Sequence, residues 1–236
     1  MQNKILTFSY DDGVTQDIRF IELLNKYGMK ATFNLNSEFL GGNWTLNREG
    51  VVVDHIKHAP EDIRSVYEGH EVAAHTLTHP FLPDIQDDNE IIQDDNEIIR
   101  QVEQDRLNLS ELCGYEVVGF AYPCGGTNYD SRVSKIIREN TGIKYCRTIV
   151  SSHSFDLQDD LFEFKPSVYH HGEWDKLFEL GEQFLSLKTD EKKIFYVWGH
   201  SYEFDIHNTW DRFEEFLKMM SGKSDIAYLT NKEALL

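Results

Sequence analysis

The sequence predicts an α/β fold in which a parallel sheet or barrel is surrounded by helices. Short strand-like runs alternate along the chain with stretches whose apolar residues have helical spacing, as such a fold requires. The chain has 236 residues, a length at which α/β barrels often form one domain. No linker rich in Pro, Gly or Ser divides it. We therefore expect residues 1–236 to form a single domain.

The predicted elements alternate between strand and helix. Residues 4–10 (KILTFSY) have the composition of a strand, and residues 15–27 that of an amphipathic helix. Apolar residues at 18, 20, 21, 23 and 24 share one helical face, and Gly28 ends the helix. The further strands are predicted over 30–35, 71–75, 116–122, 144–149, 193–198 and 225–229. The further helices are predicted over 131–140, 174–187 and 210–220.

A tandem duplication interrupts this pattern, because residues 85–91 (IQDDNEI) are repeated at 92–98. A seven-residue repeat keeps the isoleucines near one helical face and the acidic residues on the other. The segment therefore predicts a solvated acidic helix. A calcium loop is disfavoured, because the ligand spacing is wrong and the glycine of the sharp turn is missing.

Composition excludes several classes of function. Against 23 Lys and Arg stand 41 Asp and Glu, a net charge of −18, so phosphate backbones and anionic membranes would repel the chain. No apolar run is long enough to span a bilayer. The N-terminus lacks the apolar segment of a signal peptide, so we expect a cytoplasmic protein unless a leader precedes this sequence. Cysteines 113, 124 and 146 form neither a disulfide framework nor a zinc motif.

Polar residues stand at the ends of several predicted strands. Because the carboxyl ends of parallel strands meet at one edge, these residues should converge at one mouth. Two acidic residues follow the first strand, two histidines the third, a Pro-Cys-Gly-Gly turn the fourth and one histidine the strand 193–198. They are Asp11, Asp12, His75, His79, the turn 123–126 and His200.

The two histidines have the spacing of metal ligands. Two neutral imidazoles four residues apart can chelate one zinc ion. Thr76 follows the first histidine where a helical zinc protease has its catalytic glutamate, and Pro80 disfavours a helix at His79. A base and a third ligand must come from elsewhere, and the pair Asp11 and Asp12 can supply both. Each feature alone is common in turns and cores, whereas their joint arrangement favours catalysis.

These residues occur within motifs that resemble the polysaccharide deacetylases with a NodB homology domain, carbohydrate esterase family 4. Residues 7–13 (TFSYDDG) look like the first motif, TFDDG, and residues 75–79 (HTLTH) match the second, H-[ST]-x-x-H. Residues 120–125 (FAYPCG) and 197–200 (VWGH) look like later, looser motifs. The resemblance covers about residues 4–200 and implies a distorted (β/α)7-type barrel.

The resemblance also implies a reaction and its residues. It implies a divalent cation, usually zinc, although cobalt and nickel accept the same ligands. Water on the metal would attack an acetyl group of an N-acetylated or O-acetylated sugar or oligosaccharide. By position, the ligands would be Asp12, His75 and His79. Asp11 would be the base, His200 the acid, and the backbone N–H of Cys124 the donor to the oxyanion.

The chain departs from the family pattern in the third and fourth motifs. The arginine that orients the base is replaced by Ala121, so another group must hold Asp11. Cys124 stands where the family has an aromatic residue, and its backbone N–H can still donate to the oxyanion. A reactive thiol is disfavoured, because the sequence has no base beside Cys124. Glu173 is the nearest match to the carboxylate that orients the final histidine, with Glu203 as an alternative.

Aromatic residues near these motifs suit a sugar, whose C–H faces stack on rings. Tyr10, Tyr122, Trp174 and Trp198 are the candidates, with the hydrophobic core as their alternative role. The adjacent histidines 170 and 171 match no motif and are expected at the surface or supporting the site.

Two other functions stay open on the sequence alone. One is hydrolysis of a non-sugar cyclic amide on the same barrel. The other is a catalytically inactive carbohydrate-binding domain, although a binding domain needs neither a base nor an acid. The sugar, the acetyl position and the oligomeric state also stay open.

Overall fold

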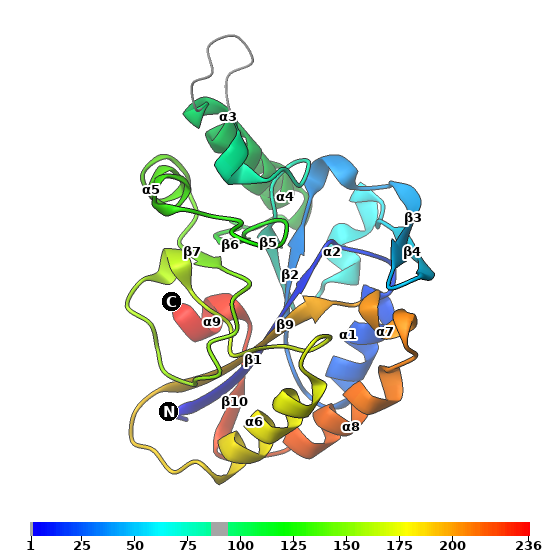
Figure 1. The fold of residues 1–236 in the computed structure, drawn as a ribbon, viewed down its shortest axis with the longest axis vertical. Coiled ribbons are helices and arrows are strands. Elements are labelled where there is room, and N and C mark those ends of the chain that lie inside the picture. Colours follow the sequence, from blue (N-terminus) through cyan, green and yellow to red (C-terminus); the bar gives the residue numbers. More distant parts are fainter. Residues whose placement is uncertain (1, 86–93) are drawn as a thin grey trace.

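A curled parallel sheet forms the centre of the molecule (Figure 1). The computed structural model describes residues 2–85 and 94–236. Strand order is β7-β6-β5-β2-β1-β9-β8, and β10 pairs with the first part of β1, all in parallel. The strands are β1 (Lys4–Asp11), β2 (Thr32–Leu35), β5 (Glu71–Ala74), β6 (Gly119–Ala121), β7 (Tyr145–Arg147), β8 (Val168–Tyr169), β9 (Lys193–His200) and β10 (Ile226–Tyr228).

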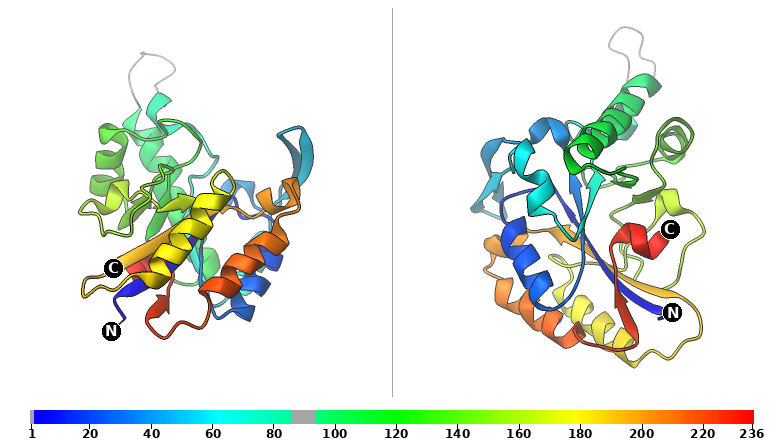
Figure 2. Two further views of the ribbon diagram at one scale, coloured as in Figure 1. Left: turned by 60° about the horizontal axis from the view of Figure 1, so that its bottom comes forward. Right: turned by 180° about the vertical axis from the view of Figure 1, so that it is seen from behind.

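Helices surround this sheet. Figures 1 and 2 show α1, α6 and α8 side by side along one part of it, with α4 and α5 toward the other. No helix within the described ranges is long and apolar enough to cross a membrane. The helices are α1 (Asp17–Lys26), α2 (Ile63–Val66), α3 (Asp95–Ile99), α4 (Asp105–Cys113), α5 (Ser131–Asn140), α6 (Trp174–Ser186), α7 (Glu203–Ile206), α8 (Trp210–Met220) and α9 (Asn231–Leu235).

The central strand β1 is buried along all eight residues. A strand covered on both faces carries a continuous rather than an alternating apolar pattern. The rings of Phe8 and Phe213 pack edge to face, with centroids 6.0 Å apart. Buried polar side chains on this strand are hydrogen bonded, because Thr7 accepts from Asn231 at 2.8 Å. Burial therefore fixes β1, whose last residue is Asp11.

Strand register brings the predicted site residues to one edge. Along β1, Asp11 pairs with His200 of β9 on one side and with Asn34 of β2 on the other. Farther along the sheet, Ala121 of β6 pairs with Arg147 of β7. These positions lie at the carboxyl ends of parallel strands, where α/β folds place their functional groups.

The sheet curls because one segment contacts both of its ends. The backbone N–H of Phe164 donates to Cys146 of β7 at 3.1 Å, and that of Ser167 donates to Tyr196 of β9 at 2.7 Å. A bridge between Arg147 and Phe164 adds to this contact. The segment therefore links β7 to β9 just before β8, and the sheet approaches a barrel.

A hairpin that the sequence analysis did not predict extends from the sheet. It consists of β3 (Asn43–Arg48) and β4 (Val51–Ile56), which pair antiparallel. The turn residues Glu49 and Gly50 have φ angles of 53° and 80°, the two positive values that a tight hairpin turn requires. Figure 2 shows the hairpin projecting beyond the helices next to α7.

The predicted α/β class is confirmed, although several elements are shorter than expected and β1 and β9 are longer. The strand predicted over 116–122, for example, comprises Gly119–Ala121. The acidic helix predicted over 85–98 falls largely on residues 86–93, which lie outside the described part of the chain. Its described end is α3, which begins at Asp95 and buries Ile98.

Candidate functional site

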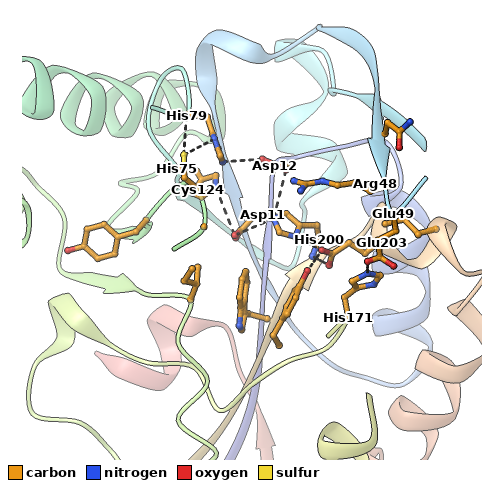
Figure 3. A pocket seen from close by; sticks show the side chains of 17 residues that line it. Asp11, Asp12, Arg48, Glu49, His75, His79, Cys124, His171, His200 and Glu203 are labelled. Carbon is orange, nitrogen blue, oxygen red and sulfur yellow. Dashed lines mark hydrogen bonds and ion pairs between the residues drawn. The ribbon is translucent and has the colours of Figure 1, made fainter. Parts of the chain in front are cut away.

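A cavity of about 620 Å³ opens where the carboxyl ends of the central strands meet (Figure 3). This volume falls within the range of small-molecule sites. Figure 3 shows side chains from β1, β9 and the loops after β5 and β6 pointing into it. All the sequence-predicted metal and acid–base residues line it, namely Asp11, Asp12, His75, His79 and His200.

Three of these residues form a cluster of potential metal ligands. Asp12, His75 and His79 each offer one ligand atom, and these atoms lie within 4.8 Å of one another. Nε2 of His79 is 3.9 Å from a carboxylate oxygen of Asp12. The turn that presents Asp12 needs a glycine next, because a Cβ at Gly13 (φ +61°) would lie 2.4 Å from Leu35. The DDG sequence thus forms a turn and also supplies a potential metal ligand, Asp12.

The loop that carries the two histidines is held by buried side chains. Nδ2 of Asn36 donates to the carbonyls of His75 and Thr76 at 2.6 and 2.9 Å. The Asp105 carboxylate accepts from the backbone N–H of His75 at 2.9 Å. Gln101, in the π-helical turn Arg100–Gln104 before α4, accepts from the backbone of the same loop. His79 lies outside any helix, with a φ of 57°, as its following proline predicts.

The protonation of these histidines suits a cation. Burial lowers the pKa of His75 to about 4, and burial also lowers the pKa of His79. Nδ1 of His75 lies 2.7 Å from the carbonyl oxygen of Ala121, which can only accept, so Nδ1 carries the hydrogen and Nε2 presents its lone pair. Neutral imidazoles and a carboxylate are the ligands that zinc prefers. The residues present therefore fit a divalent cation.

The hairpin contributes two residues to this cluster that sequence reasoning missed. Nε2 of His55 lies 3.2 Å from the Asp12 carboxylate, and Nζ of Lys57 donates to the Asp12 carbonyl. Burial by itself would raise the pKa of Asp12. Lys57, His55 and the nearby His200 and His79 outweigh burial and hold that pKa well below its usual range. Asp12 is therefore ionised, and His55 and Lys57 orient it.

The second carboxylate, Asp11, is held by groups on neighbouring strands. Nδ2 of Asn34 donates to one of its oxygens at 2.7 Å, and the guanidinium of Arg147 donates to the other at 2.5 Å. Both Asp11 and Arg147 are almost completely buried. Arg147 pairs in register with Ala121, so an arginine from the next strand occupies the place left by the one that the motif lacks. The ring of Trp198 lies 4.5 Å from this guanidinium.

His200 faces both carboxylates and is bonded from behind. Its Nε2 lies 4.0 Å from an oxygen of Asp11 and 4.0 Å from one of Asp12. Its Nδ1 lies 3.0 Å from the Glu203 carboxylate. Burial opposes protonation, but Glu203 and the two aspartates outweigh it and raise the pKa of His200 to about 9. The same pair lowers the pKa of Glu203 to about 2 despite its burial.

The loop after β6 places Cys124 across the cavity. Its φ is +69°, and Nδ2 of Asn128 donates to the carbonyls of Tyr122, Pro123 and Cys124 at 3.0 to 3.1 Å. In the described part of the chain, the backbone N–H of Cys124 has no protein acceptor. Burial, followed by Asp12, raises the pKa of the Cys124 thiol, which favours a backbone role over a reactive thiolate.

Comparisons with known proteins identify the family of this chain. A sequence model of the polysaccharide deacetylase family matches residues 1–145. The chain belongs to this family.

Solved structures extend the likeness of this polysaccharide deacetylase family member over the whole fold. A family 4 carbohydrate esterase from Streptomyces lividans, solved with acetate, is 14% identical with a TM-score of 0.57, over 96% of this chain and 92% of that one. A family 4 pseudoenzyme from Bacillus anthracis is 19% identical with a TM-score of 0.53, over 100% and 66%.

A polysaccharide deacetylase from Bacillus cereus is 17% identical with a TM-score of 0.51 and matches over 66% of this chain, which spans 44% of its length. These structures confirm the distorted (β/α)7-type barrel. No curated protein matches the chain.

The prediction that Glu173 orients His200 is wrong. Glu173 hydrogen bonds with Ser151 and His153 instead, at the start of α6. Glu203, the alternative, contacts His200 because it stands three residues after it on the turn into α7. Sequence distance misled the prediction, since the motif places its carboxylate on another segment.

Two of the four predicted sugar-binding aromatics lie elsewhere. Tyr10 is fully buried in the core and its hydroxyl lies 3.2 Å from Nδ1 of His170, which is also fully buried. Trp174 packs against that core and stacks with Arg212. Strand alternation explains Tyr10, because its neighbour Asp11 takes the cavity side. Tyr122 and Trp198 do line the cavity, together with His171.

Proposed function

We propose that this family member is a divalent-metal-dependent hydrolase that removes acetyl groups from N-acetylated sugars. The supporting observation is the cluster of Asp12, His75 and His79 with Asp11 and His200 beside it. A bound cation, zinc by the donor set, would polarise the acetyl carbonyl and lower the pKa of water. Cobalt and nickel accept the same ligands.

Asp11 is the proposed general base. Its carboxylate is fixed by Arg147 and Asn34, so one oxygen keeps its direction toward the cavity without reorganisation. Asp12 cannot share this role if it ligates the cation, and His55 and Lys57 hold it away from Asp11. The two adjacent aspartates thus divide the two functions of ligand and base.

His200 is the proposed general acid. Despite burial, the Glu203 carboxylate raises the pKa of His200, to about 9 in the metal-free protein, so that the ring can hold a proton and donate it to a departing nitrogen. An amine leaves poorly unless protonated, whereas an alkoxide leaves more readily. His200→Ala should therefore impair hydrolysis of an N-acetyl sugar far more than that of an O-acetyl sugar. Equal small losses for both would contradict the assignment.

The remaining cavity residues suit the substrate. The N–H of Cys124 is the proposed donor to the oxyanion, and one such donor contributes roughly 3 kcal/mol in other enzymes. Tyr122 and Trp198 line the cavity wall, but both are almost fully buried and stack on Tyr129 and Tyr169, so they shape the cavity rather than present an open face to a sugar. The proposed partner is an acetylated sugar or oligosaccharide.

Acetate release from metal-loaded protein tests this function. We expect zinc-loaded protein to release acetate from N-acetylated oligosaccharides and to lose this activity on chelation. Asp11→Asn and His79→Gln should each lower kcat/KM by about 10² to 10⁴. His153→Gln, an exposed histidine outside the cavity, is the matched control. Opening of a cyclic amide without acetate release would favour the rival amidase. Sugar binding without hydrolysis would favour an inactive binding domain.

A further inference from the structure

The β3–β4 hairpin is fastened to the site at its base and its middle. At the base, His55 and Lys57 contact Asp12, and the backbone N–H of Thr15 donates to Ile56 at 2.8 Å. In the middle, Val53 packs with apolar residues of the loop after β1 and of the segment at α7, which are Val14, Tyr202 and Ile206. The hairpin is thus held against the cavity wall.

The tip of the hairpin is fastened as well. The Glu49 carboxylate accepts from Nε2 of His171 at 2.8 Å and from Nε2 of His207 at 2.7 Å. These histidines follow β8 and α7, so the tip contacts the opposite rim of the cavity. Together with the base, this contact holds the backbone at Arg48, the residue just before Glu49.

Arg48 points into the cavity with no carboxylate partner. It lines the cavity, and Figure 3 shows its guanidinium directed toward Asp12. Its side chain is exposed, and across residues 2–85 and 94–236 no carboxylate oxygen lies within 4.0 Å of it. Its guanidinium lies beside the Tyr202 hydroxyl, which raises the pKa of Arg48 further. An arginine cannot lose its charge in a protein, so a permanent cation without a carboxylate partner faces the site.

Every carboxylate of the cavity already has a partner. Asp11 is paired with Arg147 and Glu203 with His200. Asp12 contacts Lys57, and Glu49 contacts its two histidines. Arg48 is therefore the positive charge left over, in a chain whose net charge is −18. A molecule this acidic repels anions unless a local cation receives them.

We propose that Arg48 binds an anionic group of the substrate, a carboxylate or a phosphate, so that the preferred substrate is an acidic N-acetylated sugar. The sugar and its acetyl group rest on the proposed function above. The guanidinium fork matches either anion with two parallel hydrogen bonds. Arg48 and Asp12 line the same cavity, so one sugar can present its charged group to Arg48 and its acetyl group near Asp12.

Direct binding tests this inference apart from catalysis. Zinc-loaded Asp11→Asn protein, which binds without turnover, is titrated by calorimetry with N-acetylglucosamine, N-acetylmuramic acid and N-acetylglucosamine 1-phosphate. We expect at least one charged sugar to bind about tenfold more tightly than the neutral one, the factor of one charge-assisted hydrogen bond. The better of the two charged sugars identifies the anion as carboxylate or phosphate.

Adding Arg48→Gln should reduce the ratio of charged to neutral affinity about tenfold, and Arg48→Lys should restore part of it. Arg64→Gln removes the same charge outside this cavity and is the control. The inference is overturned if both charged sugars bind no more tightly than the neutral sugar, or if Arg48→Gln leaves the ratio unchanged.

Acetate release from wild-type protein, measured on the same sugars, tests the proposed function separately. Charged-sugar binding that depends on Arg48 without acetate release would contradict the proposed function and uphold this inference. Acetate release together with equal affinities for charged and neutral sugars would support the proposed function and contradict this inference.

Discussion

Arg147 reaches Asp11 from the strand next to the one in which the family motif has its arginine. Neighbouring strands lie about 4.8 Å apart, a distance that a long arginine side chain can span. Because Ala121 and Arg147 are register partners, a small residue on β6 leaves room for a guanidinium from β7. In this chain the cation on Asp11 therefore comes from β7.

Arg147→Met should therefore impair catalysis more than substrate binding. We expect kcat to fall about 10²-fold, the cost of a misplaced catalytic group, with a smaller change in KM. Loss of one partner of a buried ion pair should also cost about 3 kcal/mol of unfolding free energy. Steady-state kinetics and urea unfolding measure both effects. Partial rescue of kcat by Arg147→Lys or by added guanidinium separates positioning from folding, and an unchanged kcat would refute it.

The pairing of His200 with Glu203 predicts a specific titration. In metal-free protein, where no cation competes for the aspartates, NMR should show the His200 ring titrating near pH 9. In Glu203→Gln its pKa should fall toward the ordinary value of 6.5, because the largest favourable charge is gone. His70, whose pKa burial lowers to about 4, is the internal control. A pKa of 6.5 or below for His200 in the wild-type protein would show that Glu203 does not raise it.

The same raised pKa predicts how stability depends on pH. The folded protein binds a proton at His200 that the unfolded chain releases above its pKa of about 6.5. Its contribution is therefore complete below pH 6.5 and is lost as the pH rises through 9. Urea unfolding of metal-free protein should show the advantage of wild type over His200→Gln shrinking between pH 6.5 and 9.5. A constant difference across that range would exclude this linkage.

Among the elements, those whose pattern is regular were predictable from sequence. Helix α5 keeps the periodicity that burial of Val133 and Ile137 requires, and β9 reads as a strand because nearly all of it is buried. The β3–β4 hairpin was missed because its strand β3 has no buried residue. Only β4, which begins with three valines, carries a strand-like run, and one such run does not predict a hairpin.

The site residues that could be predicted are those that belong to local sequence motifs. Asp11, Asp12, His75 and His79 carry local spacing, and the family match over residues 1–145 includes them. Arg147 and Glu203 lie beyond it, and their roles depend on strand register and a tight turn. Lys57 and Arg48 arrive on the unpredicted hairpin. The contacts of these four residues form between segments far apart in the chain or at an unpredicted turn, so no regular spacing in the sequence indicates them.

The contacts of Glu49 predict that the hairpin tip depends on them. Glu49→Ala should speed amide hydrogen exchange over β4, because the tip loses both histidine contacts. Exchange in α5 should not change, since α5 packs mainly against α3 and the short turns Leu82–Asp84 and Leu161–Glu163. Glu68→Ala, an exposed acid that follows α2 and does not line this cavity, is the control. Hydrogen exchange with mass spectrometry measures this, and an unchanged rate over β4 would contradict it.

At the scale of the whole molecule, the ligand cluster joins parts of the sheet that are not neighbours. Asp12 follows β1, while His75 and His79 follow β5, and β2 lies between these strands. The three ligands are far apart in sequence, so the unfolded chain cannot assemble them. A cation that binds them would therefore bind the folded state and stabilise the sheet as a unit.

Zinc should accordingly raise the thermal stability of the protein through this cluster. At free zinc near a thousand times its Kd, the free energy of unfolding rises by about 4 kcal/mol, which corresponds to roughly 10 °C in Tm. His79→Gln should lose this rise. His207→Gln should keep it, although His207 belongs to another histidine–carboxylate group, with Glu49 and His171. Differential scanning calorimetry with and without zinc measures the shift. Only the ligands of the bound ion link zinc binding to unfolding. If His207→Gln abolished the rise in Tm and His79→Gln kept it, the zinc ion would bind at Glu49, His171 and His207 instead.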